Sequence, residues 1–415
     1  MSSTAPMTPE GAVAPLARER SRGTNLIGVR AYNERLVLSL VRRLSSLPKS
    51  EIARLSGLSA QTASVIVKAL ESEGLLLRME PNRGRVGQPS VPLKLNPDGA
   101  YAFGLHIGRR TANLMLMDFV GSVRDQIHYS FAYPDVGDLL RFTADSLAEL
   151  TGKLSGAQQR RIAGLGVAVP FELWNWRSEV GAPHASLEHW RNCNLQAELE
   201  SLSGLSVSIS NDATAACGAE LTFGRGREYE DFLYFFVGYF AGGGVVLNGE
   251  LYSGRQGNAG ALGSMPVLIT NRDTGITERR QLIHSASLHS LERRLVVANL
   301  DPVVFFRSQA WESLGSILDD WLEEASDSLA QAIVASASVL DFNQVIIDGG
   351  FTPEVRQRLV ELVREKASVS DLQGLSPFEI GEGSIGANAR TMGAASLPFF
   401  ARFLLDQNVL FKGDN

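Results

Sequence analysis

The sequence is poor in cysteine and has no long hydrophobic segment. Its 415 residues include only two cysteines, Cys193 and Cys217, which can form neither a disulfide framework nor a thiolate zinc cluster. No apolar run approaches the roughly 18 residues that a membrane-spanning helix requires. Residues 1–24 lack an apolar secretory core and are interpreted as a disordered leader. These absences favour a protein of the reducing cytoplasm.

The charge is distributed unevenly along a chain long enough for two or three domains. Residues 1–95 carry a net charge of +7, whereas the remaining residues carry −13. A basic module on an acidic body indicates that only the N-terminal part binds a polyanion. We therefore expect a DNA-binding domain over residues 25–95. After the turn-rich segment "NPDGA", a second unit is expected over residues 96–415.

Residues 25–95 have the pattern of a winged helix-turn-helix. Apolar residues recur at helical spacing in residues 30–44, and a second short helix is expected to end at Gly57. The segment "LSAQTASVIVKALESEG" predicts a third helix with Ser59 as its N-cap. A ribbon of two short strands is expected to follow. The predicted buried face of the third helix consists of Val65, Ile66, Ala69 and Leu70.

The third helix begins with the polar residues that such a motif places in the major groove. Glutamine can pair bidentately with adenine, and threonine can contact a base edge or a thymine methyl group. Basic and hydroxyl side chains hold phosphates. The alternative is a helical hairpin that binds protein, but the basic charge and the ribbon favour DNA. The predicted DNA contacts of the helices are Ser50, Arg54, Ser59, Ala60, Gln61, Thr62, Ser64 and Lys68.

The segment "NRGRVGQPS" predicts the tip of the wing. Arg83 and Arg85 alternate with glycines, which let a backbone approach another surface closely. Arginines presented in this way suit a narrow, A·T-rich minor groove. Gln88, in the same tip, is a third predicted DNA contact. The alternative is a solvated hairpin tip without a ligand.

Beyond residue 96, strands and helices alternate as in an α/β protein. A strand, a glycine turn and a second strand occur near residues 101–123 and again near residues 231–252, which suggests a duplicated fold with a cleft between two lobes. The first turn carries Arg109 and Arg110. Guanidinium groups match phosphate or carboxylate geometry, so both arginines are candidate contacts for an anionic effector. The alternative is that both are solvated on a hairpin turn.

Taken together, the motifs resemble the ROK family, which comprises bacterial sugar-responsive repressors and sugar kinases. The segments occur in one order and cover about residues 25 to 400: "SEIARLSGLSAQTASVIVKALESEGLL", "GRVGQPS", "GLHIG", "SNDATAACGAE", "VGYFAGGGVVLNGELYSG" and "GNAGALGSM". The resemblance implies an N-terminal winged helix-turn-helix followed by a two-lobed, actin-like α/β body. Such a body has the sugar-kinase fold, built from two duplicated ribonuclease H-like lobes.

The resemblance also implies roles for particular residues. The catalytic base of the family's kinases is the aspartate of an Asn-Asp pair, which corresponds to Asn211 and Asp212. From the residues alone, Asp212 could equally be a helix cap. The second phosphate loop of the family matches Gly238 and residues 242–244. Consecutive glycines allow close approach to phosphate, and they also form ordinary tight hairpins.

Several departures from the family pattern argue against phosphoryl transfer. His106 replaces an acidic residue of the first nucleotide loop, where the two arginines also replace glycines. Ala261 and Ser264 replace a sugar-contacting glutamate and histidine, and Ile283 aligns with a further glutamate. The cysteines of the family's zinc motif have no counterpart, and His284 and His289 are five residues apart, which does not place them on one helix face. The sequence therefore predicts no metal site and no cofactor.

The sequence predicts a transcriptional regulator, specifically a repressor, that binds an inverted repeat in operator DNA as a homodimer or tetramer. Its kinase-like body is expected to sense a small sugar or sugar derivative without phosphorylating it, so that Asp212 is a vestigial base. An alternative is an active ATP-dependent sugar kinase with an appended DNA-binding domain, which the retained Asp212 supports. A third is a body that binds no ligand and only dimerises. The predicted effector contacts are Asn211, Asp212, His184 and Ser264.

Overall fold

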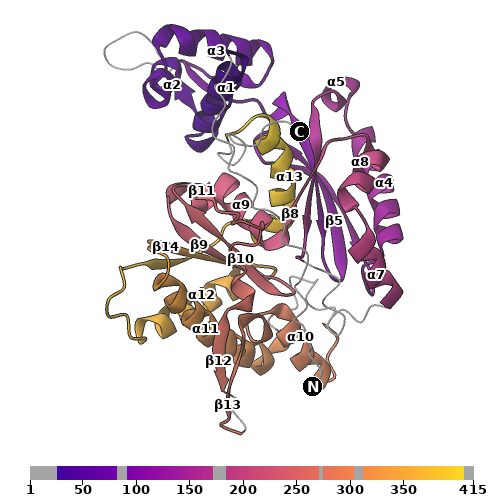
Figure 1. The fold of residues 1–415 in the computed structure, drawn as a ribbon, viewed down its shortest axis with the longest axis vertical. Coiled ribbons are helices and arrows are strands. Elements are labelled where there is room, and N and C mark those ends of the chain that lie inside the picture. The colour runs from indigo at the N-terminus through magenta and orange to yellow at the C-terminus, as the bar shows by residue number, and fades with distance from the viewer. Residues whose placement is uncertain are drawn as a thin grey trace, which may run out of the picture.

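A small N-terminal head lies on a two-lobed body (Figure 1). The structure is a computed structural model that describes residues 26–81, 91–171, 184–270, 274–302, 311 and 313–405. The predicted leader and the predicted wing contacts Arg83, Arg85 and Gln88 lie outside these residues.

The head contains the predicted three helices and the predicted ribbon. Ser59 caps the third helix, since its hydroxyl accepts a hydrogen bond from the backbone N–H of Thr62. The ribbon is antiparallel and gains a short third strand, which the sequence analysis did not predict. The elements are α1 (Leu26–Arg43), β1 (Leu47–Pro48), α2 (Lys49–Ser56), α3 (Ala60–Ser72), β2 (Leu76–Arg78) and β3 (Pro92–Leu95).

One predicted buried position in the head is wrong. Val65 is 62% exposed, whereas Ala63 and Val67 are buried. The helix turns the residues at 63, 66, 67 and 70 toward α1 and α2, as the i, i+3, i+4, i+7 spacing of a buried stripe requires. Val65 therefore lies on the outer face of α3, among the polar residues.

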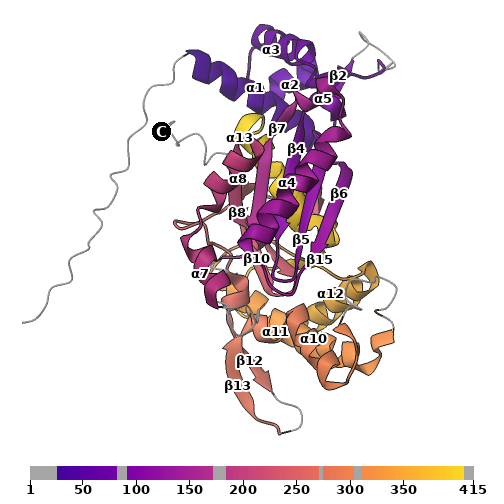
Figure 2. The same cartoon turned by 90° about the vertical axis from the view of Figure 1, so that its right-hand side faces the viewer.

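The first lobe is built on a five-stranded sheet with the order β6-β5-β4-β7-β8. Strands β6, β5 and β4 are antiparallel, and β7 and β8 continue the sheet in parallel. Figure 2 shows α4 and α8 in front of this sheet. The elements are β4 (Tyr101–Ile107), β5 (Thr111–Asp118), β6 (Val123–Ser130), α4 (Val136–Gly152), α5 (Gly156–Gln159), β7 (Ile162–Val169), α7 (His184–Asn192), α8 (Leu195–Ser203) and β8 (Val207–Asn211).

The second lobe repeats this topology, which confirms the predicted duplication. Its sheet has the order β11-β10-β9-β14-β15, again with three antiparallel strands followed by two parallel ones. A separate hairpin of β12 and β13 projects from the end of the lobe (Figure 1). The elements are β9 (Phe232–Val237), β10 (Ala241–Leu247), β11 (Glu250–Leu251), β12 (Pro266–Thr270), β13 (Thr277–Gln281), α10 (Leu288–Val297), α11 (Ser316–Ala337), β14 (Gln344–Gly349), α12 (Pro353–Ser368) and β15 (Glu379–Glu382).

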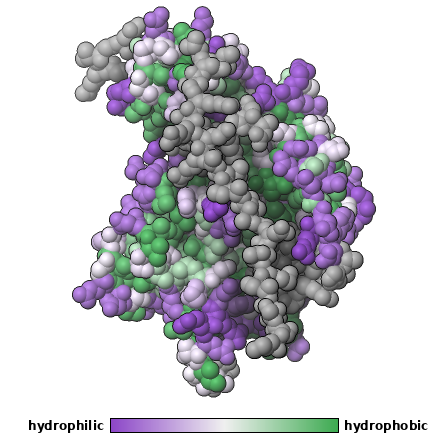
Figure 3. Space-filling model, in the orientation of Figure 1, coloured by the Kyte–Doolittle hydropathy of each residue, from purple (hydrophilic) through white to green (hydrophobic). Residues whose placement is uncertain are grey.

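Two helices, α9 (Asp212–Phe223) and α13 (Ala389–Arg402), pack against each other in the middle of the body. Helix α9 is buried on nearly every side, so it has almost no face in contact with solvent. Helix α13 lies on β4 and β7 of the first sheet, whereas α9 also contacts β10 of the second. On the face shown in Figure 3, hydrophobic residues gather toward this middle region and hydrophilic residues dominate the outer edges.

The head and the body share one hydrophobic core. Val37 and Val41 of α1 belong to the same buried cluster as Phe119, which follows β5, and Phe399 of α13. The head is therefore packed against the body and not merely tethered to it. Among the described helices, none has both the length and the apolar character that crossing a bilayer requires.

Gly166 of β7 allows the closest approach of α13. A Cβ atom at this position would lie 1.7 Å from the backbone oxygen of Ala394, so a side chain forces the helix away from the strand. We expect Gly166→Ala to lower the free energy of unfolding by about 1–3 kcal/mol or more, as overpacking does. Denaturant unfolding measures the change. Gly152→Ala is the matched control, because no atom lies within 4 Å of the added group, and a loss of equal size there would contradict this account.

Candidate functional site

The outer face of α3 carries the predicted DNA contacts. Gln61, Thr62, Ser64 and Lys68 are all exposed, as is Ala60 at the start of the helix. Ser59 is occupied as the helix cap and also contacts the hydroxyl of Thr62 at 2.8 Å. A hydrophobic side chain on this face is Val65, which could contact a thymine methyl group and which the sequence analysis placed in the core.

The predicted phosphate contacts on α2 are exposed as well. Ser50 lies in the first turn of the helix, where free backbone N–H groups favour anions. Arg54 pairs with Glu51 at 2.6 Å, and the two side chains are 67% and 41% exposed. Exposed pairs of this kind contribute little to stability, so the guanidinium can exchange the carboxylate for a phosphate at small cost.

A second candidate site is a cavity of about 100 Å³ between the two lobes. It lies where β8 ends, α9 begins, β9 turns into β10, and α13 starts. Its aromatic lining comprises Phe171, Phe236 and Phe240, and its polar side chains are Arg109, Asn211, Asp212, Asn258, Ser264 and Arg390.

Asn211 and Asp212 have different roles at the start of α9. The Asn211 side chain is the cap, since its oxygen accepts hydrogen bonds from the N–H groups of Ala213 and Thr214 at 3.0 and 3.2 Å. Asp212 uses one carboxylate oxygen to accept from the N–H of Ala213. Its other oxygen lies 3.9 Å from His106 Nε2 and 3.7 Å from Arg390 Nη1. Asp212 is therefore more than a helix cap.

The cavity fixes the charges of these groups. Burial opposes ionisation of Asp212, but His106 and the positive charges of Arg390 and Arg109 outweigh it and hold its pKa at about 2. Burial, together with the charge of Arg390, lowers the pKa of His106 to about 4. The distance of 3.9 Å between His106 Nε2 and the Asp212 carboxylate is too long for a hydrogen bond. At neutral pH the site thus holds a carboxylate, a neutral imidazole and two guanidinium groups.

The two arginines of the first turn are placed differently. Arg109 is buried, and its guanidinium lies 4.1 Å above the ring of Phe240 in the β9–β10 turn. The alternative that both arginines are solvated is therefore wrong for Arg109. Arg110 does not line the cavity; its guanidinium donates to the backbone oxygen of Ala132 and interacts with Tyr239. Arg109 alone is placed to contact a ligand in the cavity.

The run of glycines in β10 is explained by packing. A Cβ atom at Gly242 would lie 2.7 Å from Cβ of Ala213, and one at Gly244 would lie 2.5 Å from Cβ of Cys217. Both neighbours belong to α9. The glycines therefore let β10 approach α9 closely, whether or not a phosphate ever binds here.

The family's lost sugar contacts fall on the wall of the cavity. Ala261, Ser264 and Ile283 line it, so two apolar groups and one hydroxyl stand where the resemblance implies two glutamates and a histidine. His184 begins α7, and its side chain lies outside the described residues. Sequence reasoning missed Asn258, although it lies in the quoted segment "GNAGALGSM", and Arg390, for which no motif gave a signal.

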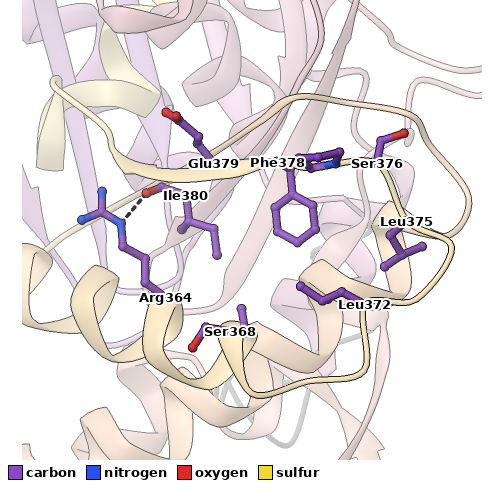
Figure 4. A pocket seen from close by; sticks show the side chains of 10 residues that line it. Arg364, Ser368, Leu372, Leu375, Ser376, Phe378, Glu379 and Ile380 are labelled. Atoms are coloured by element: carbon purple, nitrogen blue, oxygen red, sulfur yellow. Dashed lines mark hydrogen bonds between the residues drawn. The ribbon is translucent and has the colours of Figure 1, made fainter.

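A larger hollow of about 590 Å³ lies on the second lobe, between α12 and β15 (Figure 4). Its Arg364 donates to the backbone oxygen of Ile380, and Phe378 packs on Phe342 at 5.8 Å. Arg364 thus serves the fold, whereas Arg390 of the interlobe cavity lies beside the Asp212 carboxylate. In the described part of the chain, no three histidine, cysteine or acidic side chains are grouped so that they could hold a metal ion.

Sequence comparisons agree with this two-part arrangement. The family model described as "ROK family" matches residues 102–399, and the one described as "Winged helix-turn-helix DNA-binding" matches residues 30–76. The chain is 22% identical over 386 residues to the xylose repressor of Bacillus subtilis, which covers 89% of this chain and 95% of that protein.

Two solved structures have a similar fold. One is described as a ROK family transcriptional regulator, homologous to the Escherichia coli MLC protein; it has a TM-score of 0.65 and 19% identity, and the match covers 90% of this chain and 97% of that one. The other is a ROK family glucokinase from Streptomyces griseus in complex with glucose and AMPPNP, with a TM-score of 0.56, 19% identity and coverage of 72% and 99%. Regulators and kinases thus share this body.

The buried imidazole of His106 predicts a pH dependence of stability. Its folded-state pKa of about 4 lies below the ordinary 6.5, so between these values the unfolded chain binds a proton that the folded chain excludes. The free energy of unfolding therefore falls as the pH decreases through this window, by about 3 kcal/mol in total. We expect His106→Gln to flatten this slope in urea unfolding. The control His128→Gln, on the exposed side of β6, should keep it; an unchanged slope in His106→Gln contradicts a buried neutral imidazole.

Proposed function

The chain belongs to the ROK family, and from that premise we propose that it is a DNA-binding transcriptional repressor whose body senses a small sugar or sugar derivative without phosphorylating it. One observation carries the proposal: the polar outer face of α3 lies on a head that shares its hydrophobic core with the body containing the cavity. A DNA-binding surface and a ligand site are thus parts of one packed unit.

The cavity supports a polyol or related ligand. Asp212 offers an ionised acceptor and Asn258 an amide, and the aromatic rings of Phe236 and Phe240 offer apolar faces, as is usual in small-molecule sites. Relatives named "Xylose repressor" and "N-acetylglucosamine repressor" support a sugar effector. The guanidinium of Arg109 makes an acidic or phosphorylated sugar equally suitable.

The same cavity argues against phosphoryl transfer. Catalysis of that reaction consists mainly of positioning and of neutralising phosphate charge, commonly through Mg²⁺. The anionic Asp212 could accept a proton, but a general base contributes only about 10²–10⁴-fold. The first loop presents His106 where the resemblance implies an acid, and Arg109 fills the space beside Phe240. The catalytic base is therefore retained without the groups that would position the nucleotide and the sugar beside it.

Binding to operator DNA tests the proposal most directly. Footprinting should show an inverted repeat with half-sites about one helical turn, or a multiple of it, apart. Gln61→Ala should cost about 1–3 kcal/mol and relax the preference at one base position. Lys68→Ala should weaken binding to all sequences alike and reduce the dependence on salt. Protection of a single unrepeated site, or equal effects of both variants on specificity, contradicts this assignment.

Asp212 should be essential for the response to the effector. A panel of neutral, acidic and phosphorylated sugars, titrated by calorimetry, identifies the ligand. Removing a charged partner from a buried polar site costs about 1–3 kcal/mol or more, so Asp212→Ala should abolish effector-induced release while operator binding persists. Ser290→Ala, outside the cavity lining, is the control.

A coupled assay with ATP and Mg²⁺ should show no turnover of sugar; turnover that Asp212→Asn removes would identify a working kinase.

A further inference from the structure

Helices α9 and α13 both run from the interlobe cavity to the DNA-binding head. Helix α9 begins with Asp212 at the cavity and ends with Phe223. Helix α13 has Arg390 in its first turn, also at the cavity, and carries Phe399 near its other end, in the core shared with the head. Figures 1 and 2 show α13 reaching from between the lobes to the underside of the head.

The cavity ends of the two helices are joined by charge. Arg390 Nη1 lies 3.7 Å from the Asp212 carboxylate, and the guanidinium lies 4.9 Å from the centre of the Phe236 ring. Arg390 Nε is buried without a hydrogen-bond partner among the described residues. A pair at this distance is not fixed by a direct hydrogen bond. A ligand that binds Asp212 or Arg390 therefore changes the geometry of the pair.

Helices α9 and α13 are closely packed, backbone against backbone. Gly393 of α13 faces α9 so closely that a Cβ atom would lie 1.8 Å from the backbone oxygen of Ala215. On its other side α13 meets Gly104 of β4, where a Cβ atom would lie 2.3 Å from the oxygen of Thr391. Interiors packed at this density transmit displacement and do not absorb it. A shift at the cavity ends is thus passed along the pair.

At the head, α9 contacts the side chain of Arg42 in α1 directly, and α13 reaches it through Phe119. The guanidinium of Arg42 lies 5.4 Å from the ring of Phe223, the last residue of α9, and 5.2 Å from the ring of Phe119. Arg42 also donates a hydrogen bond to the backbone oxygen of Phe119. The Phe119 ring in turn packs edge-on against Phe399 of α13, with the ring centres 5.4 Å apart. Burial lowers the pKa of Arg42 to about 10, so it stays charged at neutral pH.

We propose that α9 and α13 couple the cavity to the head, with the Asp212–Arg390 pair as the input and Arg42 as the output. Ligand binding reorients the pair, the close-packed helices shift together, and the rings around Arg42 move the α1 helix that supports α3. Arg390 and Arg42 are positioning residues in this scheme. The inference rests on the proposed function for its biological meaning, but the mechanical coupling exists with or without a known ligand.

A double-mutant cycle tests the coupling without any effector. Helices of 12 and 14 residues place the two arginines roughly 20 Å apart. Mutations so far apart normally combine within about twofold in affinity. We make Arg390→Gln and Arg42→Lys in the full chain, separately and together, and measure operator affinity. The change in affinity of the double mutant should differ from the product of the two single-mutant changes by about fivefold or more, the lower range of allosteric coupling.

The matched control is Arg294→Gln. Arg294 is a part-buried arginine of α10 that pairs with Glu324 of α11, away from α9 and α13. When Arg294→Gln is combined with Arg42→Lys, the change in operator affinity should equal the product of the two separate changes. Arg390→Lys keeps the charge and should restore most of the wild-type affinity, which a merely misfolded Arg390→Gln protein would not explain. Products within twofold for both pairs overturn the proposal.

Hydrogen exchange gives a readout that does not require DNA. Arg390→Gln should speed amide exchange in residues 35–43 of α1 by about fivefold or more, whereas Arg294→Gln should not. If the wild-type chain binds no DNA, the proposed function fails while this readout still decides the coupling. Exchange in α1 that is unchanged by Arg390→Gln overturns it.

Discussion

The close approach of helix α13 to its neighbours is the constraint on which the structure depends. Backbone meets backbone at Gly104, Gly166 and Gly393, where an added Cβ atom would overlap an opposing oxygen or nitrogen. Van der Waals contact at this range allows little rotation or sliding of the helix. It therefore fixes both where Arg390 enters the cavity and where Phe399 meets the head.

Electrostatics then gives the cavity its chemical character. Asp212 stays ionised beside two guanidinium groups, and His106 stays neutral because burial and the charges of these two groups oppose a further positive charge. This balance suits a ligand that offers hydroxyls, an anionic group or both. It does not assemble a metal-binding acid next to a phosphate loop, as phosphoryl transfer requires.

Much of the architecture could be predicted because its signals are local. Helical spacing, the Ser59 cap and the ribbon predicted the winged helix-turn-helix, and a repeated strand–turn–strand pattern predicted the duplicated body. Val65 shows the limit of such reasoning. Within "ASVIV", two apolar stripes are possible, and only packing against α1 and α2 selects the one that buries Ala63 and Val67.

The sequence by itself determined the fold class and the family, and it predicted two kinds of site, because each of these inferences depends on motifs of residues that are near one another in the chain. Tertiary structure alone decided that Arg390 joins Asp212 across 178 positions, that Arg109 stacks on Phe240, and that glycines of β10 serve packing against α9. These contacts join segments that are far apart in the chain, and no local sequence pattern indicates which of them will meet. Only the folded chain brings their charges and surfaces into reach, since such forces act over a few ångströms.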